Sequence, residues 1–165
     1  MVAVVVMGVC GCGKSTLAIT LAKELNGVFI EGDNLHPEAN VAKMASGSAL
    51  SDEDRWPWLT TVGASLSGNE VTVAACSALK KVYRDRIRET AGRDVQFIFL
   101  NGERPLIESR MSEREGHYMP TRLIESQFAI LEDPTEEADV LSISIDDTPV
   151  NITQQALNWL EKTDD

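Results

Sequence analysis

The glycine-rich segment 8–16 constrains the fold of this 165-residue chain more than any other stretch. It fits the pattern G-x-x-x-x-G-K-S/T, whose backbone N–H groups surround nucleotide phosphates. Such a site needs a buried strand that delivers the loop to the N-terminus of a helix. The apolar run 2–7 precedes the loop, and an apolar segment that begins Leu17-Ala18 follows it. The segment therefore predicts a strand, a phosphate-binding loop and a helix, in that order.

The loop supplies the candidate nucleotide site. We expect ATP to bind along Gly8, Val9, Cys10, Gly11, Cys12, Gly13, Lys14, Ser15 and Thr16. The Lys14 ammonium should reach the β- and γ-phosphates, and the Ser15 hydroxyl should hold Mg²⁺. The alternative is a strand-to-helix turn that binds nothing. Because the strand, the complete pattern and the helix occur in register, we favour the nucleotide site.

Length and composition indicate a single globular domain over residues 1–165. The chain is 43% hydrophobic and 25% charged, which is ordinary for a folded protein. Its first residues carry no basic segment, and the apolar run 2–7 is too short to cross a bilayer. We therefore expect neither a signal peptide nor a membrane anchor, and a cytoplasmic location.

The three cysteines are expected to be reduced thiols. The number of cysteines is odd, and two of the three (Cys10, Cys12 and Cys76) lie inside the phosphate loop, where a bridge would distort the turn. A metal site at Cys10-x-Cys12 is disfavoured because His36 and His117 are isolated in the sequence.

The charge distribution argues against a nucleic-acid partner and for a small anionic ligand. The formal net charge is −11, whereas nucleic-acid binding favours a broad basic face. Ten of the fifteen Lys and Arg residues nevertheless lie between Lys80 and Arg122. A localised basic segment in an acidic chain suits a small anion.

Strands and helices alternate along the chain. Strands are expected at 2–7, 28–30, 71–75, 95–100 and 140–145, and helices at 14–25, 37–45, 51–66, 82–90, 105–114, 121–131 and 149–160. This alternation predicts an α/β fold with a five-stranded parallel sheet and right-handed crossovers. Ligands of such folds bind at the carboxyl ends of the strands.

Two acids, Glu31 and Asp33, follow the second predicted strand. A carboxylate there could hold Mg²⁺ through water or accept a proton from an attacking hydroxyl. The alternative is a pair of solvated turn acids. No aspartate ends the third strand, where switch GTPases and motor ATPases place a magnesium ligand, and no Asn-Lys-x-Asp sequence occurs. Both absences favour a small-molecule kinase over a nucleotide switch.

Arg110 and Arg114 lie one helical turn apart after the fourth strand. The glycine and proline in 116–120 would permit a mobile flap, so segment 104–122 is predicted to be a helical lid that brings cations onto the transferred phosphoryl group. The alternative is a salt-bridged surface helix, because Glu108, Glu113 and Glu115 lie nearby.

Further blocks have no generic role in phosphate binding. They are Gly32-Asp33-x-Leu35-His36-Pro37, Lys43-Met44-Ala45-x-Gly47, Asp52-x-Asp54-Arg55-x-Pro57-Trp58-Leu59, Cys76-Ser77-Ala78-Leu79-Lys80-Lys81-x-Tyr83-Arg84, Glu108-Ser109-Arg110 and Gly116-His117. Together with the loop they resemble bacterial gluconokinases of the short, P-loop type. The resemblance runs from Met7 to about Val140.

The resemblance implies transfer of the γ-phosphoryl group of ATP to the 6-hydroxyl of D-gluconate, in a nucleoside-monophosphate-kinase-like fold that is usually a homodimer. It implies that Asp33 is the base for the hydroxyl. The residues implied around gluconate are His36, Arg55, Lys80 and Arg84. Those implied to stabilise the phosphoryl group are Lys14, Arg110 and Arg114.

The chain departs from the family pattern at three positions. Cys10 and Cys12 stand where serine is frequent, and Glu31 stands where aspartate is frequent. Two alternatives stay open. A shikimate-kinase-like enzyme should show a glycine triplet after the third strand, where this chain has Cys76-Ser77-Ala78. A non-catalytic nucleotide-binding module would need neither the base nor the lid arginines.

Overall fold

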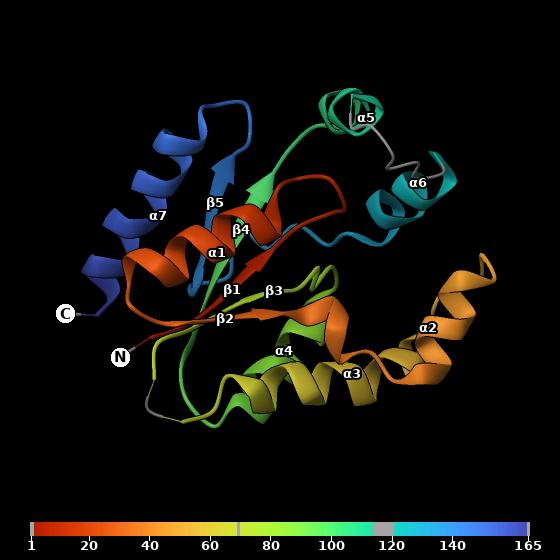
Figure 1. Cartoon of the computed structure of the whole chain (residues 1–165), viewed down its shortest axis with the longest axis horizontal. Helices are drawn as coiled ribbons and strands as arrows, with labels where there is room; N and C mark the ends of the chain where they lie inside the picture. Colours follow the sequence, from red (N-terminus) through yellow and green to blue (C-terminus); the bar gives the residue numbers. More distant parts are fainter. Residues whose placement is uncertain (1, 69, 114–120, 165) are drawn as a thin grey trace.

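The structure is a computed structural model that describes residues 2–68, 70–113 and 121–164. Within these ranges, five parallel strands form one sheet in the order β2-β3-β1-β4-β5 (Figure 1). The strands are β1 (Ala3–Met7), β2 (Val28–Glu31), β3 (Thr72–Ala75), β4 (Val95–Asn101) and β5 (Val140–Ser144). The predicted α/β fold with a parallel sheet is confirmed.

Strand β1 lies at the centre of the sheet, between β3 and β4. Its residues are all buried because helices cover both faces, which explains its unbroken apolar sequence. Side chains of a strand alternate between faces, so Val4 and Val6 belong to one core cluster and Val5 to the other. The loop that follows β1 therefore leaves from the middle of the sheet edge.

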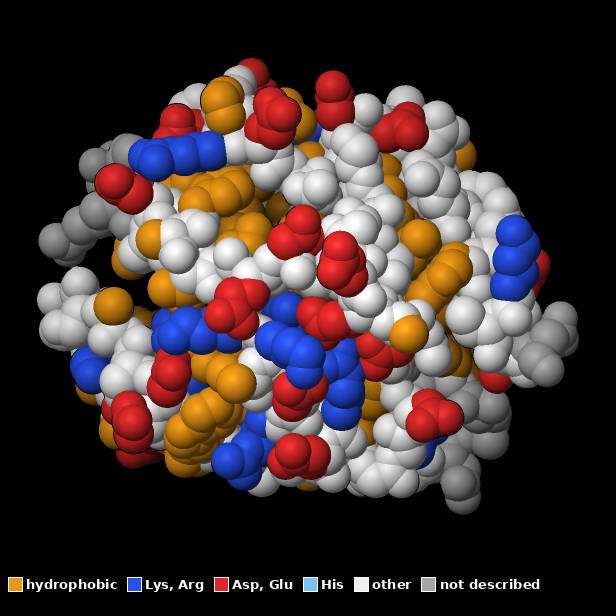
Figure 2. Space-filling model, turned by 180° about the vertical axis from the view of Figure 1, so that it is seen from behind, with side chains coloured by type: hydrophobic (Ala, Val, Ile, Leu, Met, Phe, Trp, Pro, Cys, Tyr) orange, Lys and Arg blue, Asp and Glu red, His pale blue; other side chains and the backbone are white. Residues whose placement is uncertain are grey.

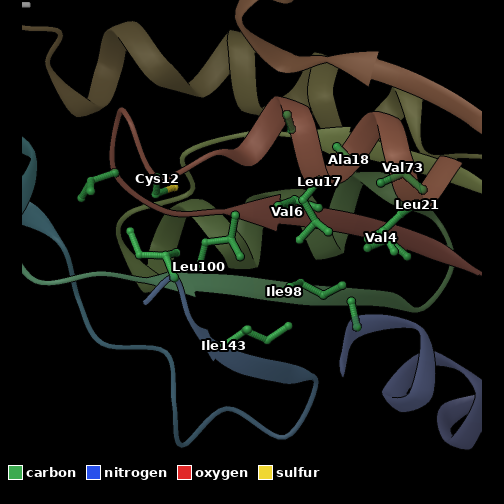
Figure 3. Close-up of a cluster of buried hydrophobic side chains, with 14 of the residues drawn as sticks. Val4, Val6, Cys12, Leu17, Ala18, Leu21, Val73, Ile98, Leu100 and Ile143 are labelled. Carbon is green, nitrogen blue, oxygen red and sulfur yellow. The ribbon is translucent and has the colours of Figure 1, made fainter. Parts of the chain in front are cut away.

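Helices flank the sheet on both sides (Figure 1). They are α1 (Lys14–Glu24), α2 (Glu38–Ala45), α3 (Asp52–Ser65), α4 (Lys81–Ala91), α5 (Arg104–Ser112), α6 (Thr121–Ile130) and α7 (Pro149–Thr163). Helices α1 and α7 cover one face, and α3 and α4 cover the other. Figure 3 shows Leu17 and Leu21 of α1 packed over Val4 and Ile98 of the sheet.

Most predicted elements are present with boundaries shifted by one or two residues. Helix α3 begins with a capping box, in which the Ser51 hydroxyl accepts from the Asp54 N–H and the Asp54 carboxylate accepts from the Ser51 N–H. Pro37 is the N-cap of α2 rather than its first residue. A short 3-10 helix, η1 (Gly32–Leu35), was not expected.

The carboxyl ends of the strands carry the loops of interest. The phosphate loop follows β1, η1 follows β2, and residues 76–80 follow β3. The Gly8 N–H donates to the Ser77 carbonyl at 3.2 Å, so the first and third of these loops are in direct contact. No helix of the described part of the chain is both long and apolar enough to cross a membrane.

Candidate active site

The phosphate loop has the geometry of an anion site. Gly13, with φ +95°, is the N-cap of α1, and within the described chain no side chain caps this helix end. The N–H groups of the first turn are therefore directed at the loop without a side-chain acceptor, in a place where the helix dipole favours negative charge. The Lys14 ammonium donates to the Val9 carbonyl at 3.0 Å and is thus held across the loop.

Ser15 and Glu31, the two residues of the predicted magnesium site, are in direct contact. Ser15 Oγ donates to Glu31 Oε2 at 2.5 Å, so the first turn of α1 meets the end of β2. Hydroxyl and carboxylate oxygens are hard donors, and Mg²⁺ takes one or two such ligands together with phosphates and water. Among the described residues no group of three or more His, Cys, Asp or Glu is arranged to hold a metal. The pair fits an ion completed by nucleotide phosphates.

Asp33 is exposed on η1, whose position is fixed by packing. A Cβ on Gly32 would lie 2.3 Å from the Ala75 carbonyl oxygen, so only glycine lets η1 lie against the end of β3. The Trp58 indole N–H donates to the Gly32 carbonyl at 2.8 Å in a buried bond. These two contacts place the Asp33 carboxylate at the sheet edge.

Three predicted site residues act electrostatically on the buried thiol of Cys76. Burial raises the pKa of its thiol to about 12. The negative charges of Asp33 and Glu31 contribute to this rise, and the positive charge of Lys14 opposes it. Asp33, Glu31 and Lys14 therefore lie close enough to act electrostatically on one buried atom at the end of β3.

His36 is held in a fixed orientation beside Asp33. Its ring stacks on Trp58 with centroids 4.0 Å apart, and its Nδ1 lies 3.2 Å from Asn40 Nδ2. Burial lowers the pKa of His36, the Arg55 charge lowers it further, and the Asp33 charge opposes them. The ring is therefore mainly neutral at pH 7 and can donate or accept a hydrogen bond.

Arg55 and Lys80 meet at the carboxylate of Asp52. Lys80 Nζ lies 3.2 Å from Asp52 Oδ1, and Arg55 Nη1 lies 3.8 Å from the same oxygen. Arg55 also donates to the Tyr83 hydroxyl at 2.7 Å, and that hydroxyl donates to Asp52. Burial and the Asp52 contact raise the pKa of Tyr83 to about 12, so the phenol stays protonated. We name Asp52, Arg55, Lys80 and Tyr83 the cation cluster.

Sequence reasoning gave Asp52 and Tyr83 no role in the site. The signal that could have identified them is helical spacing. Asp52 precedes Arg55 by three residues on α3, and Tyr83 follows Lys80 by three at the start of α4. The hydrogen bonds from Tyr83 and Lys80 lower the pKa of Asp52, so its carboxylate stays charged.

Arg84, which the resemblance places beside gluconate, is fully buried in this structure. Its side chain is 0% exposed. Nη1 donates to the Ala78 carbonyl at 2.7 Å, Nη2 and Nε donate to the Glu137 carboxylate, and Nη2 also donates to the Glu132 carbonyl. These contacts hold Arg84 against the turn after β3, and its contact with gluconate stays a prediction.

The exposed side of α4 carries a network of ion pairs rather than an open basic face. Arg88 pairs with Glu137, Asp139 and Asp85, each at 2.7 or 2.8 Å. Figure 2 shows Lys and Arg side chains interleaved with Asp and Glu over this side of the molecule. Five of the ten basic residues between Lys80 and Arg122 form ion pairs with carboxylates in the described structure, namely Lys80, Lys81, Arg84, Arg88 and Arg104.

Only part of the predicted lid can be placed. Arg110 lies on α5 and donates to the Ile145 carbonyl at 2.8 Å. Arg104 and Glu108 form an ion pair at 2.8 Å on the same helix. Such a pair is expected under the alternative interpretation, in which this segment is a salt-bridged surface helix. Arg114 and His117 lie outside the described residues, so the juxtaposition of Arg110 with Arg114 stays a prediction.

Similarity to known proteins agrees with this geometry. Residues 4–134 match the family described as "AAA domain". The thermoresistant gluconokinase of Escherichia coli (strain K12) is 41% identical over 163 residues, which cover 96% of this chain and 93% of that protein. The thermosensitive gluconokinase of the same organism is 44% identical over 156 residues, covering 92% and 83%.

Solved structures agree with these relatives. A gluconokinase from Sinorhizobium meliloti 1021 superposes with a TM-score of 0.92 at 41% identity, covering 98% of this chain and 93% of that one. A shikimate kinase from Aquifex aeolicus superposes with a TM-score of 0.63 at 14% identity, covering 98% and 97%, and so shares the fold alone. The chain has the P-loop kinase fold and belongs to the gluconokinase family.

Proposed function

We propose that this protein is an ATP-dependent gluconokinase, which transfers the γ-phosphoryl group of ATP to the 6-hydroxyl of D-gluconate to give 6-phospho-D-gluconate. The observation that carries the proposal is the position of Asp33. Its charge acts on Cys76 together with Lys14, and on His36 together with Arg55. Asp33 thus acts electrostatically on groups near both the phosphate loop and the cation cluster, which supports its proposed role as the base for phosphoryl transfer.

The phosphate side of the reaction would be handled by α1 and its loop. The uncapped N–H groups of the first turn and the Lys14 ammonium would bind the β- and γ-phosphates of ATP. Ser15 and Glu31 are the residues that would hold Mg²⁺, directly or through water. When bound, the ion would neutralise charge on the phosphate oxygens. Arg110 and Arg114 are proposed to stabilise the transferred group.

The acceptor side would be handled by η1 and the cation cluster. Asp33 would orient the gluconate hydroxyl and accept its proton, which is a modest demand because phosphoryl transfer has a loose transition state. One carboxylate and two cations give the cation cluster a formal charge of +1, which complements a single carboxylate. His36, whose ring is held by Trp58 and Asn40, would hydrogen-bond a gluconate hydroxyl.

We further propose that the chain is a single kinase domain that acts in the cytoplasm as a homodimer. Three free cysteines suit a reducing compartment. The exposed apolar side chains of Val41 and Met44 on α2 are candidate dimer contacts. Light scattering on the purified protein tests the dimer. The lid at 104–122 stays a prediction.

The test of the activity is ATP consumption with D-gluconate, shikimate, D-glucose or no acceptor. We expect rapid formation of ADP and 6-phospho-D-gluconate with D-gluconate alone. Lys14→Ala should lower turnover about 10²-fold or more while the protein stays folded by thermal melting. Equal activity on glucose or shikimate would overturn the assignment. ATP binding without turnover on any acceptor would favour a nucleotide-binding module.

A further inference from the structure

One hydrogen bond joins the phosphate loop to a distant helix. The Cys10 N–H donates to Oε1 of Gln127 on α6 at 2.6 Å, across 117 residues of sequence. The contact is partly buried. The Cys10 backbone amide, part of the predicted phosphate loop, is thus hydrogen-bonded by a side chain from outside the loop.

Gly11, the next residue of the phosphate loop, packs against α5. Gly11 has φ +79°, and a Cβ built on it would lie 2.5 Å from Met111 Sδ and 3.5 Å from Ile107 Cγ2, both on α5. Met111 and Ile107 are buried in the same core cluster as Val9. Helices α5 and α6 therefore contact two consecutive residues at the tip of the loop, one by packing and one by a hydrogen bond.

The Gln127 contact leaves the first turn of α1 open to an anion. Cys10 lies in the turn closed by the bond from the Cys12 N–H to the Val9 carbonyl, before the N-cap Gly13. The first turn of α1, where phosphates would bind, has no side-chain cap in the described structure. The Val9 carbonyl also accepts from Lys14 Nζ, so the turn that Gln127 holds is the one that positions the lysine.

We propose that Gln127 is a positioning residue of the phosphate loop: its side-chain carbonyl fixes the turn 9–12 and thereby the Lys14 ammonium and the affinity for nucleotide phosphates. This inference rests on the proposed function because it requires that the phosphate loop binds a nucleotide. It concerns a residue on α6, outside the phosphate loop. The predicted consequence is an effect on nucleotide binding that is separate from binding of the acceptor.

The test compares Gln127→Met with the parent. Methionine has a similar length but no strong acceptor, so the helix is preserved while the bond to the Cys10 N–H is lost. Binding of ADP with Mg²⁺, measured by calorimetry, should weaken about three- to tenfold, as expected for one lost hydrogen bond. The KM for gluconate should stay within about twofold, and hydrogen exchange at the Cys10 amide should accelerate.

Gln154→Met is the matched control, because Gln154 bonds only to Asn158 among its described partners, on the exposed face of α7. It should leave both nucleotide binding and Cys10 exchange unchanged. Gln127→Ala provides a second variant if the methionine packs poorly, and it should weaken ADP binding in the same range. Thermal melting of all variants separates loop effects from unfolding.

The outcomes distinguish this inference from the proposed function. If Gln127→Met binds ADP as the parent does, the inference is overturned even where the parent phosphorylates gluconate. If faster Cys10 exchange comes without weaker ADP binding, Gln127 is structural only and the inference also fails. If the parent binds ADP, loses affinity in Gln127→Met and does not phosphorylate gluconate, the inference stands and the proposed function fails.

Discussion

Ser15 Oγ donates a 2.5 Å hydrogen bond to Glu31 Oε2, which joins the first turn of α1 to the last residue of β2. In switch GTPases and motor ATPases the magnesium carboxylate follows the strand that corresponds to β3. Here β3 ends at Ala75 and is followed by Cys76, and the acid comes from β2, the next strand outward. The Glu31 side chain, one methylene longer than aspartate, reaches the serine in this structure.

Glu31→Ala should weaken nucleotide binding in a way that excess Mg²⁺ restores. The substitution removes a carboxylate that would hold the ion while leaving the loop amides untouched. We expect the Mg²⁺ concentration for half-maximal ADP binding, measured by calorimetry, to rise about tenfold, which corresponds to about 1.4 kcal/mol. Glu24→Ala, at the exposed C-terminal end of α1, is the control. An unchanged Mg²⁺ requirement would remove Glu31 from the metal site.

The strands and helices could be predicted because the order of apolar and polar residues along most of them is typical of their type. The run 2–7 is apolar at every position because β1 is covered on both faces, and α1 shows Leu17 and Leu21 on one side. Helix η1 carries no such signal. Its four residues depend on the close approach of Gly32 to Ala75 and on the Trp58 hydrogen bond. Both contacts are long-range and cannot be read from local sequence.

Asp33→Asn tests the base directly because it keeps the shape of the side chain and removes its charge. If Asp33 orients the hydroxyl and accepts its proton, kcat should fall about 10²–10⁴-fold while ADP affinity stays near that of the parent. Steady-state kinetics and calorimetry on one preparation separate the two effects. Asn34→Ala, on the same exposed turn, should have little effect on kcat. Activity of Asp33→Asn within a few-fold of the parent would make Asp33 a solvated turn acid.

Lys80 and Lys81 form a natural pair of variant and control. Lys80 reaches Asp52 in the cation cluster, whereas Lys81 is 60% exposed and pairs with Asp85 on the surface. Lys80→Ala should raise the KM for gluconate about tenfold or more and that for ATP much less, because a carboxylate would lose a charge-assisted partner. Lys81→Ala should change neither. Equal effects on both substrates in Lys80→Ala would place the lysine outside the acceptor site.

The protein contacts of Arg84 could not be predicted from the sequence. Arg84 lies one turn after Lys80 on a basic helix, and the resemblance implies that both residues lie beside gluconate. Its partner Glu137 is 53 residues away in sequence, and the Ala78 carbonyl it binds belongs to a residue with φ +45°. This backbone conformation is rare outside glycine and costs free energy, and the hydrogen bond from Arg84 helps to stabilise it at Ala78. Neither feature is visible in a single sequence.

Glu137→Gln tests the role of Arg84 in stability and in its dependence on pH. Burial alone would raise the pKa of Glu137, but hydrogen bonds and charges from Arg84 and Arg88 outweigh it, so the net effect is a lowered pKa. A carboxyl whose folded-state pKa is lowered stabilises the protein above its unfolded pKa of about 4.3, and this stabilisation is lost as the pH falls through the folded-state value.

At pH 7 the free energy of unfolding of Glu137→Gln, measured with guanidinium chloride, should be about 2–4 kcal/mol lower than that of the parent, because the charge of fully buried Arg84 loses its partner. The difference between the two proteins should shrink as the pH falls from 5 to 3, where the parent carboxylate is itself protonated. Glu136→Gln, exposed and adjacent, should follow the parent at every pH. A deficit in Glu137→Gln that stays constant down to pH 3 would mean that packing of the side chain, and not its charge, stabilises the turn after β3.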